Sequence, residues 1–120
     1  MRAFAVLVMA GSALVVVSAA PASAHGANTN GCSSSPDSGY APMYFNFHNA
    51  CDWHDLCYHN HPYGGGSAGR LACDEGFKSR MRTWCANQYP QWYASPAKLN
   101  CYALAQTYYA AVRSFGGSHF

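Results

Sequence analysis

The stretch CDWHDLCYHN, residues Cys51–Asn60, places two cysteines, two histidines and two aspartates within ten positions. This density fits a metal cage, a disulfide beside a catalytic base, or an ordinary polar helix. On a helix of 3.6 residues per turn, His54 and Asp55 share a mostly apolar face with both cysteines. The periodicity therefore predicts that His54 and Asp55 point towards the interior of the protein.

Helical segments surround this stretch, and no segment shows the alternation typical of a β-strand. Asn46 is a suitable N-cap for the first helix, and Pro62 lies beyond its end. A short glycine-rich loop follows, so the next helix should run antiparallel to the first. The sequence predicts three helices, over about residues 46–60, 69–88 and 96–114. The expected fold class is all-α: a small disulfide-stapled domain with two long antiparallel helices that carry the active site and a third packed helix.

The first 24 residues have the composition of a secretory signal peptide. Arg2 precedes a long apolar run, and Ala22 and Ala24 form the small-residue pattern that signal peptidase reads. The run is too short for a membrane anchor. We therefore expect residues 1–24 to be removed and residues 25–120 to form one secreted, extracellular domain, a monomer without a transmembrane segment.

Charge argues against some partners of this domain. The whole chain has a formal net charge of +2, which becomes +1 when Arg2 is lost. Such a small charge implies neither nucleic-acid binding nor general electrostatic attraction to membranes. We expect the basic side chains to lie on a solvated surface: Arg70, Lys78, Arg80, Arg82, Lys98 and Arg113.

The cysteines all lie in the expected mature part: Cys32, Cys51, Cys57, Cys73, Cys85 and Cys101. An even number of cysteines in an exported chain indicates three disulfides. Their spacing alone is compatible with many pairings. Each bridge is expected to stabilise the fold by roughly 2 to 4 kcal/mol.

Apolar stripes identify the inward faces of the second and third helices. The stripe of the second helix contains Leu71, Cys73, Phe77, Met81, Trp84 and Cys85. The stripe of the third contains Leu99, Tyr102, Leu104, Tyr108, Tyr109, Val112 and Phe115. Asp74 falls within the second stripe, and a carboxylate there is costly unless another group hydrogen-bonds it. We therefore expect Asp74 to have a buried partner.

His54 is the natural partner of Asp74, because each lies on the inward side of one of the two antiparallel helices. A carboxylate behind an imidazole fixes its tautomer and leaves the other ring nitrogen free to accept a proton. The neighbouring cysteines are expected to be oxidised, so water is the expected nucleophile. Asp55 could then be an oxygen ligand of a hard cation such as calcium.

These residues resemble a known family, the secreted phospholipases A2. The run CDWHDLCYHN is similar to their active-site helix, in which a His-Asp pair is followed by X-Cys-Tyr or, in the bacterial and fungal branch, X-Gly-Tyr. The adjacent Cys73 and Asp74 resemble the animal and venom branch. Three further segments are similar to the bacterial and fungal branch: NGCSSSPD to its calcium loop, FNFHNAC to the start of its active-site helix, and TYYAAVRSFG to its last helix. The resemblance extends from about Asn30 to Gly116.

The resemblance implies a calcium-dependent phospholipase A2. Such an enzyme is a carboxylic ester hydrolase that acts at the surface of a phospholipid bilayer or micelle and releases the sn-2 fatty acid. It implies that His54 is the base that activates water and that Asp74 orients it. It also implies the disulfides Cys32–Cys51, Cys57–Cys73 and Cys85–Cys101.

The calcium ligands implied by the resemblance are the Asp55 carboxylate and the Gly31 carbonyl. Asn30 stands where the bacterial and fungal branch usually has a second carboxylate for calcium. An amide oxygen can coordinate calcium but brings no negative charge, so we expect weaker binding.

An acyl chain would need an apolar channel, and its candidate wall residues are Phe47, Phe77, Met81 and Tyr109, which could equally form ordinary core. Tyr58 is a further candidate for the substrate site. Tyr58 and Tyr109 could also hydrogen-bond Asp74, as tyrosines do in this family, or merely fill space, and the first reading is favoured for Tyr58. Three aromatic residues could seat the protein at a lipid interface or simply pack: Trp53, Trp92 and Tyr93.

Two alternatives belong to other functional classes. The first is a non-catalytic lipid- or protein-binding module on the same scaffold, with calcium binding weakened by Asn30. The second is a zinc-binding domain that uses His48, His59 and His61 with reduced cysteines. Oxidation during export would disfavour the second alternative.

Overall fold

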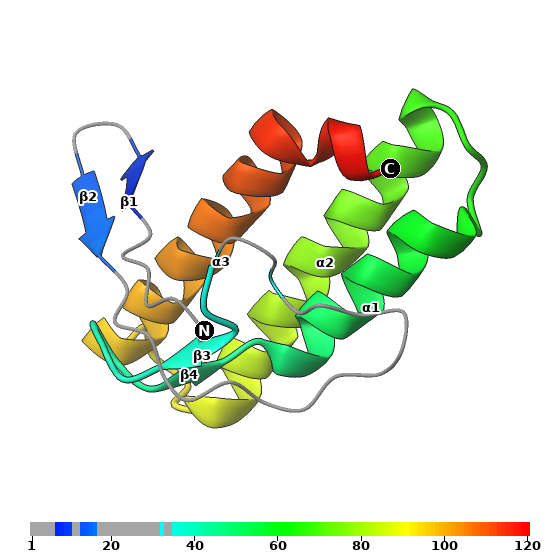
Figure 1. Ribbon diagram of the computed structural model, residues 1–120. Coiled ribbons are helices and arrows are strands. Elements are labelled where there is room, and N and C mark those ends of the chain that lie inside the picture. Colours follow the sequence, from blue (N-terminus) through cyan, green and yellow to red (C-terminus); the bar gives the residue numbers. More distant parts are fainter. Residues whose placement is uncertain (1–6, 11–12, 17–31, 33–34) are drawn as a thin grey trace.

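The computed structural model describes residues 7–10, 13–16, 32 and 35–120. Three α-helices dominate it (Figure 1). The elements in chain order are β1 (Leu7–Ala10), β2 (Ala13–Val16), β3 (Ser38–Gly39), β4 (Phe45–Asn46), α1 (His48–Asn60), α2 (Ser67–Gln88), α3 (Pro96–Phe115) and the 3₁₀-helix η1 (Gly116–His119). The predicted helical class is confirmed.

The described residues also form two short antiparallel strand pairs, which the sequence did not predict. β1 pairs with β2, within the residues that we expect to be removed, and β3 pairs with β4. The β3–β4 pair joins Ser38 to Asn46 and Gly39 to Phe45. Two residues per strand are too few for alternation of side chains to show in a sequence. The β3–β4 pair leads directly into α1 and so sets where that helix begins.

The helices begin close to the predicted residues. α1 begins two residues later than predicted, because Asn46 accepts the backbone N–H of His48 at 3.0 Å from outside the helix, while Phe47 is the N-cap. α2 begins at Ser67, earlier than predicted. α3 begins at Pro96 as predicted, and the Ser95 side chain caps it by accepting a backbone N–H at 3.2 Å.

The predicted antiparallel arrangement of α1 and α2 is confirmed, and α3 packs along α2 (Figure 1). The main core consists of Met43, Phe45, Phe47, Ala50, Cys51, Phe77, Met81, Cys85, Cys101, Leu104, Ala105 and Tyr108. Three predicted stripe positions are wrong, because Leu71, Leu99 and Phe115 are 42%, 52% and 79% exposed. Leu71 and Leu99 each lie two residues, about 200° of helical rotation, from a buried cysteine.

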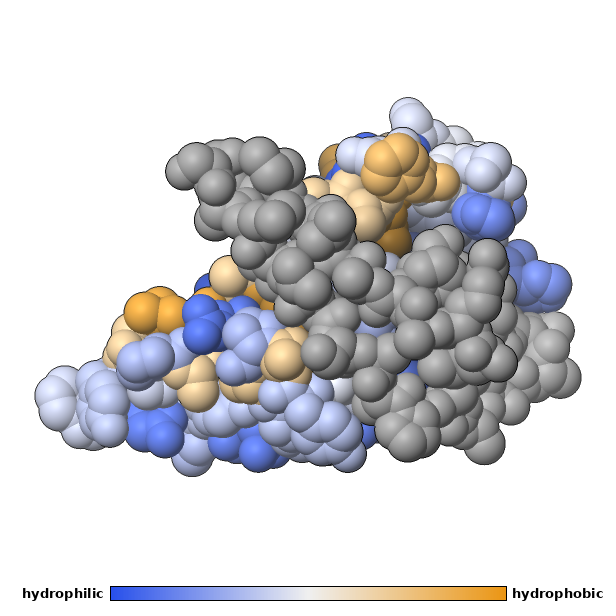
Figure 2. All heavy atoms as spheres, turned by 60° about the vertical axis from the view of Figure 1, so that its left-hand side comes forward, coloured by the Kyte–Doolittle hydropathy of each residue, from blue (hydrophilic) through white to orange (hydrophobic). Residues whose placement is uncertain are grey.

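Trp53 lies between α1 and α2 rather than at an exposed surface. Its indole covers Gly76 so closely that a Cβ on that glycine would lie 2.3 Å from the ring. The Arg80 guanidinium lies 4.3 Å from the centre of the same ring. Trp92 and Tyr93 are 94% and 52% exposed, so they remain available to a lipid surface. On the face of the molecule that Figure 2 shows, the hydrophobic residues lie in separate places among hydrophilic ones.

All six cysteines are oxidised, and the pairing implied by the resemblance is confirmed. Cys32–Cys51 ties the preceding segment to α1, Cys57–Cys73 ties α1 to α2, and Cys85–Cys101 ties α2 to α3. The segment before β3 and the three α-helices are thus joined covalently in chain order. No thiolate is left for zinc, so the zinc-binding alternative is wrong.

Candidate active site

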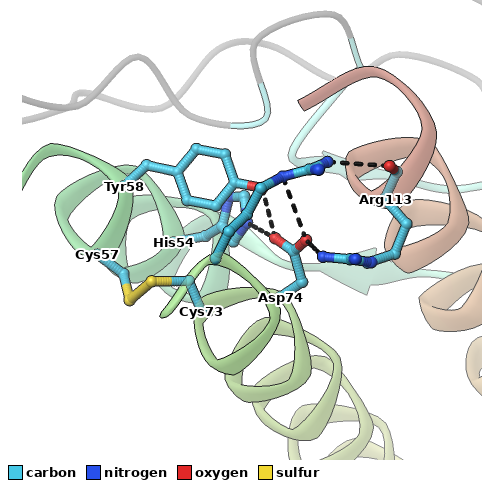
Figure 3. Close-up of a disulfide and its surroundings, with 7 residues drawn as sticks. His54, Cys57, Tyr58, Cys73, Asp74 and Arg113 are labelled. Atoms are coloured by element: carbon cyan, nitrogen blue, oxygen red, sulfur yellow. Dashed lines mark hydrogen bonds and ion pairs between the residues drawn. A yellow bond between two sulfur atoms is a disulfide. The ribbon is translucent and has the colours of Figure 1, made fainter. Parts of the chain in front are cut away.

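His54 and Asp74 form a buried pair at the interface of α1 and α2. His54 Nε2 lies 2.7 Å from Asp74 Oδ1, and the two residues are 6% and 0% exposed (Figure 3). An ionised carboxylate can only accept hydrogen bonds, so Nε2 carries the proton of this contact. The structure therefore brings together the two residues that the sequence predicted, and Nδ1 is left as the ring nitrogen that can accept a proton.

Tyr58 lies one turn after His54 on α1 and binds the same carboxylate oxygen. Its hydroxyl donates to Asp74 Oδ1 at 2.6 Å, and its ring centre lies 4.2 Å from that of His54. Burial and the hydrogen bond to Asp74 raise the pKa of Tyr58 to about 12. Tyr58 therefore remains a neutral donor at physiological pH, and its predicted bond to Asp74 is confirmed.

Tyr109, the other tyrosine considered for this role, binds elsewhere. Its hydroxyl donates to the Glu75 carboxylate, and the ammonium of Lys78 lies 4.3 Å from its ring centre. This bond to Glu75 raises the pKa of Tyr109 and lowers that of Glu75. Tyr109 therefore belongs to a surface cluster on α2 and α3, and of the two readings considered for it the hydrogen bond to Asp74 is not the one found.

Two arginines complete the surroundings of Asp74. Arg113 Nη1 donates to Asp74 Oδ2 at 2.6 Å, as Figure 3 shows. Arg70 Nε donates to the Tyr58 hydroxyl at 3.1 Å and lies 3.9 Å from Asp74 Oδ2. The prediction that both arginines lie on a solvated surface is wrong, because their guanidinium groups are turned onto a buried carboxylate.

These contacts decide the charge of Asp74. Burial is the largest single influence and raises the pKa, but the hydrogen bonds from His54, Tyr58 and Arg113 together outweigh it and lower the pKa below its usual value. Asp74 is therefore ionised at physiological pH. An ionised carboxylate behind His54 can stabilise the imidazolium that forms when Nδ1 takes up a proton.

A cavity of about 200 Å³ opens beside this pair. Its lining residues are Cys32, Ser35, Cys51, His54, Asp55, Tyr58, Phe77, Tyr108, Ala111, Val112, Phe115, Gly116 and His119. The side formed by α2 and α3 is largely apolar, whereas His54 and Asp55 supply polar groups from α1. Such a cavity can hold an apolar chain with its reactive group next to His54.

The structure changes the predicted substrate wall. Tyr58 and Phe77 line the cavity, whereas Phe47 and Met81 are 1% and 0% exposed within the core. Phe47 shares the wheel position of His54, but it precedes α1 and packs against Trp84 and Tyr108. The part of the cavity wall that the sequence did not predict is formed by the last turns of α3 and by η1. Phe115 continues the face of Tyr108, and there α3 borders the cavity instead of the core.

Part of the predicted calcium site lies in the described residues. Asp55 lines the cavity beside His54, whereas Asn30 and Gly31 lie outside the described part of the chain. Cys32, the next residue, also lines the cavity and is held there by its bridge to Cys51. Asp55 thus places one carboxylate, an oxygen ligand of the kind that calcium prefers, beside His54.

Other metal sites have no support in the described residues. Over residues 7–10, 13–16, 32 and 35–120, no group of three or more His, Cys, Asp or Glu side chains could hold a metal. His48 lies 2.9 Å from the Asp37 carboxylate, His59 is exposed, and His61 stacks on Phe120. Within the same described ranges, no helix combines the length and apolarity needed to cross a bilayer.

Comparison with known proteins gives one match. The family "Prokaryotic phospholipase A2" matches residues 17–116 of the chain. No curated protein and no solved structure matches the chain. The matched range contains both members of the His54–Asp74 pair and all six cysteines.

Proposed function

Because this chain belongs to the prokaryotic phospholipase A2 family, we propose that it is a secreted, calcium-dependent phospholipase A2 that hydrolyses the sn-2 ester of glycerophospholipids. Membership of the family supports phospholipase activity in general. The observation that carries the finer proposal is the buried pair of His54 and Asp74, 2.7 Å apart, beside a cavity with an apolar wall.

In the proposed reaction, His54 acts as a general base. Nδ1 takes a proton from a water molecule as the water oxygen attacks the sn-2 carbonyl carbon. The electron pair of the C=O double bond moves onto the carbonyl oxygen, which becomes an oxyanion. When the tetrahedral species collapses, the C–O bond to the glycerol breaks and the imidazolium returns its proton to that oxygen. The products are a fatty acid and a lysophospholipid. Asp74 stays ionised throughout and stabilises the imidazolium.

Calcium would be held by the Asp55 carboxylate, the Gly31 carbonyl and the Asn30 amide, and when bound it would supply positive charge for the substrate phosphate and the developing oxyanion. The chain's own residues supply the remaining functions. Phe77 and the last turns of α3 enclose the acyl chain and exclude water from it. The bilayer or micelle surface is the proposed partner, and exposed Trp92 and Tyr93 would suit it.

Removing calcium tests this proposal. The protein is incubated with vesicles that carry a labelled sn-2 acyl chain, with millimolar calcium or with excess chelator. We expect chelation to lower fatty-acid release by about 10²–10³-fold, the effect typical of losing electrostatic stabilisation of an oxyanion. Release that continues unchanged in chelator would contradict calcium dependence.

The variant Asn30→Asp distinguishes the proposal from the non-catalytic module, which Asn30 itself suggests. An added carboxylate should strengthen calcium binding, measured by calorimetry, while the unaltered protein already hydrolyses phospholipid. If only the Asn30→Asp protein binds millimolar calcium and releases fatty acid, the unaltered chain is a binding module.

The Cys57–Cys73 bridge offers a prediction about both stability and activity. Replacing both cysteines by alanine should lower the free energy of unfolding by about 2–4 kcal/mol, measured by urea denaturation. It should also lower hydrolysis, because this bridge joins the two helices that hold His54 against Asp74. The Cys85–Cys101 pair closes a loop of the same sequence separation, 16 residues, away from that contact. Its removal should cost similar stability and less activity. Equal losses of activity would show that the bridges act only through stability.

A further inference from the structure

We propose that Arg113 is a positioning residue of the active site, which holds one oxygen of Asp74 so that the other faces His54. The proposal rests on the proposed function, since it concerns the same catalytic pair. Arg113 was expected on a solvated surface, but its guanidinium joins the end of α3 to Asp74 on α2.

The two oxygens of Asp74 have separate partners. Oδ1 receives His54 Nε2 at 2.7 Å and the Tyr58 hydroxyl at 2.6 Å, whereas Oδ2 receives Arg113 Nη1 at 2.6 Å. A carboxylate is planar, so rotation about its last side-chain bond moves both oxygens together, and a donor on either oxygen restrains that rotation. A charge-assisted bond to Oδ2 fixes that rotation. Arg113 therefore sets the direction of the bond that orients the imidazole.

Arg113 is itself held in place by Arg70. The Nη2 atom of Arg70 donates to the backbone carbonyls of Val112 and Arg113 at 2.7 and 2.9 Å. Both carbonyls belong to the last turn of α3; that of Val112 also accepts the backbone N–H of Gly116, and that of Arg113 is among the last carbonyls of the helix, which often need partners from outside it. Arg70 thus pins the end of α3 to the first turns of α2, and the Arg113 guanidinium reaches Asp74 from a fixed backbone. Val112 also lines the cavity, so the wall proposed for the acyl chain is joined to the same contacts.

Arg113 makes the hydrogen bond to Asp74 that was considered for a second tyrosine, Tyr109. Tyr109 lies one helical turn before it on α3 and binds Glu75 instead. A guanidinium brings a full positive charge where a phenol would bring a neutral donor, and bonds to charged groups are stronger than neutral ones. The Arg113 side chain is 33% exposed, whereas Asp74 is fully buried. The contact therefore supplies a charge to the buried carboxylate from the rim of the site.

Kinetics of Arg113 variants test the proposal. The substrate is a short-chain phospholipid below its critical micelle concentration, so that binding to an interface does not enter KM. We expect Arg113→Gln to lower kcat by about 10–100-fold, as outer-shell partners of oriented histidines do, while KM changes by about twofold or less. Arg113→Lys should recover part of the loss, because an ammonium restores the charge. The control is Arg82→Gln, an exposed guanidinium over the ring of Tyr102, which should leave both constants unchanged.

A second readout does not depend on turnover. In protein labelled with ¹⁵N-histidine, the Nε2 proton of His54 should give a far-downfield NMR signal in the unaltered protein, and this signal should weaken or move upfield in Arg113→Gln but not in Arg82→Gln. A kcat for Arg113→Gln within about twofold of the unaltered value, or an unchanged His54 signal, would overturn the positioning role. If the unaltered protein hydrolyses no phospholipid, the proposed function fails, and the NMR comparison still decides the role of Arg113.

Discussion

Replacing His54 by glutamine should lower phospholipid hydrolysis by about 10²–10⁴-fold, the contribution typical of a general base. Glutamine is similar in reach and can donate its amide N–H to Asp74, so the buried carboxylate keeps a partner and the protein stays folded. The measurement is release of the labelled sn-2 acyl chain from vesicles at saturating calcium, together with circular dichroism to check the fold. Residual activity near that of the unaltered protein would show that His54 is not the base.

His59 provides the matched control for this variant. It lies five residues further along α1, is exposed, and does not line the cavity. The same substitution at His59 should leave the rate of hydrolysis unchanged within about twofold, because surface substitutions rarely disturb a fold. Equal losses in both variants would point to a general effect on α1 instead of the loss of a base.

Replacing Asp74 by asparagine should abolish most of the activity and also destabilise the protein. Asparagine has nearly the same shape but no charge, so Arg113 and Arg70 lose the anion on which they converge. Breaking a buried ion pair costs about 3–5 kcal/mol, and the partial exposure of Arg113 places the expected loss near the lower figure. Urea denaturation at neutral pH measures it. Asp52→Asn, which alters a carboxylate that is 24% exposed and lies near His48, should cost about 1 kcal/mol or less.

The difference in unfolding free energy between the unaltered protein and Asp74→Asn should depend on pH, because the pKa of Asp74 is lowered in the folded protein. A carboxyl whose pKa is lower in the folded than in the unfolded state contributes its full stability above the unfolded value, about 4. The contribution is lost as the pH falls through the folded value. The stability gap between the unaltered protein and Asp74→Asn should therefore be largest near neutral pH and shrink below about pH 4. A gap that widened on acidification would contradict an ionised Asp74.

Helical periodicity was sufficient to predict the central pair of the site. His54 and Asp74 fall on inward faces of neighbouring helices, and a short glycine-rich loop forces those helices to run antiparallel. The contact between the two residues needs no information beyond this pattern, because a buried imidazole and a buried carboxylate satisfy one another. Periodicity predicted the start of α1 less well, because the β3–β4 pair decides where that helix begins.

The two arginines could not be predicted in the same way. Arg70 precedes Asp74 by one helical turn, which is a detectable signal for an ion pair within α2. Arg113 is 39 residues from Asp74, and its contact depends on how far α3 extends along α2. The same packing decides that Phe115 borders the cavity while Phe47 and Met81 are enclosed by the core. These outcomes depend on how the helices stack, which periodicity within one helix does not determine.

Three bridges join the segment before β3 to α1, α1 to α2, and α2 to α3. Lipolysis should therefore start only after these bridges have formed. A domain of this size has a small core, and each of its three bridges should contribute about 2–4 kcal/mol, so the chain without any of them is expected to be largely unfolded. While its thiols are reduced, the newly made polypeptide would be latent, with no assembled pocket for a lipid. The producing cell would thus be spared the digestion of its own bilayer, because maturation would be completed by an oxidant found beyond the cytoplasm.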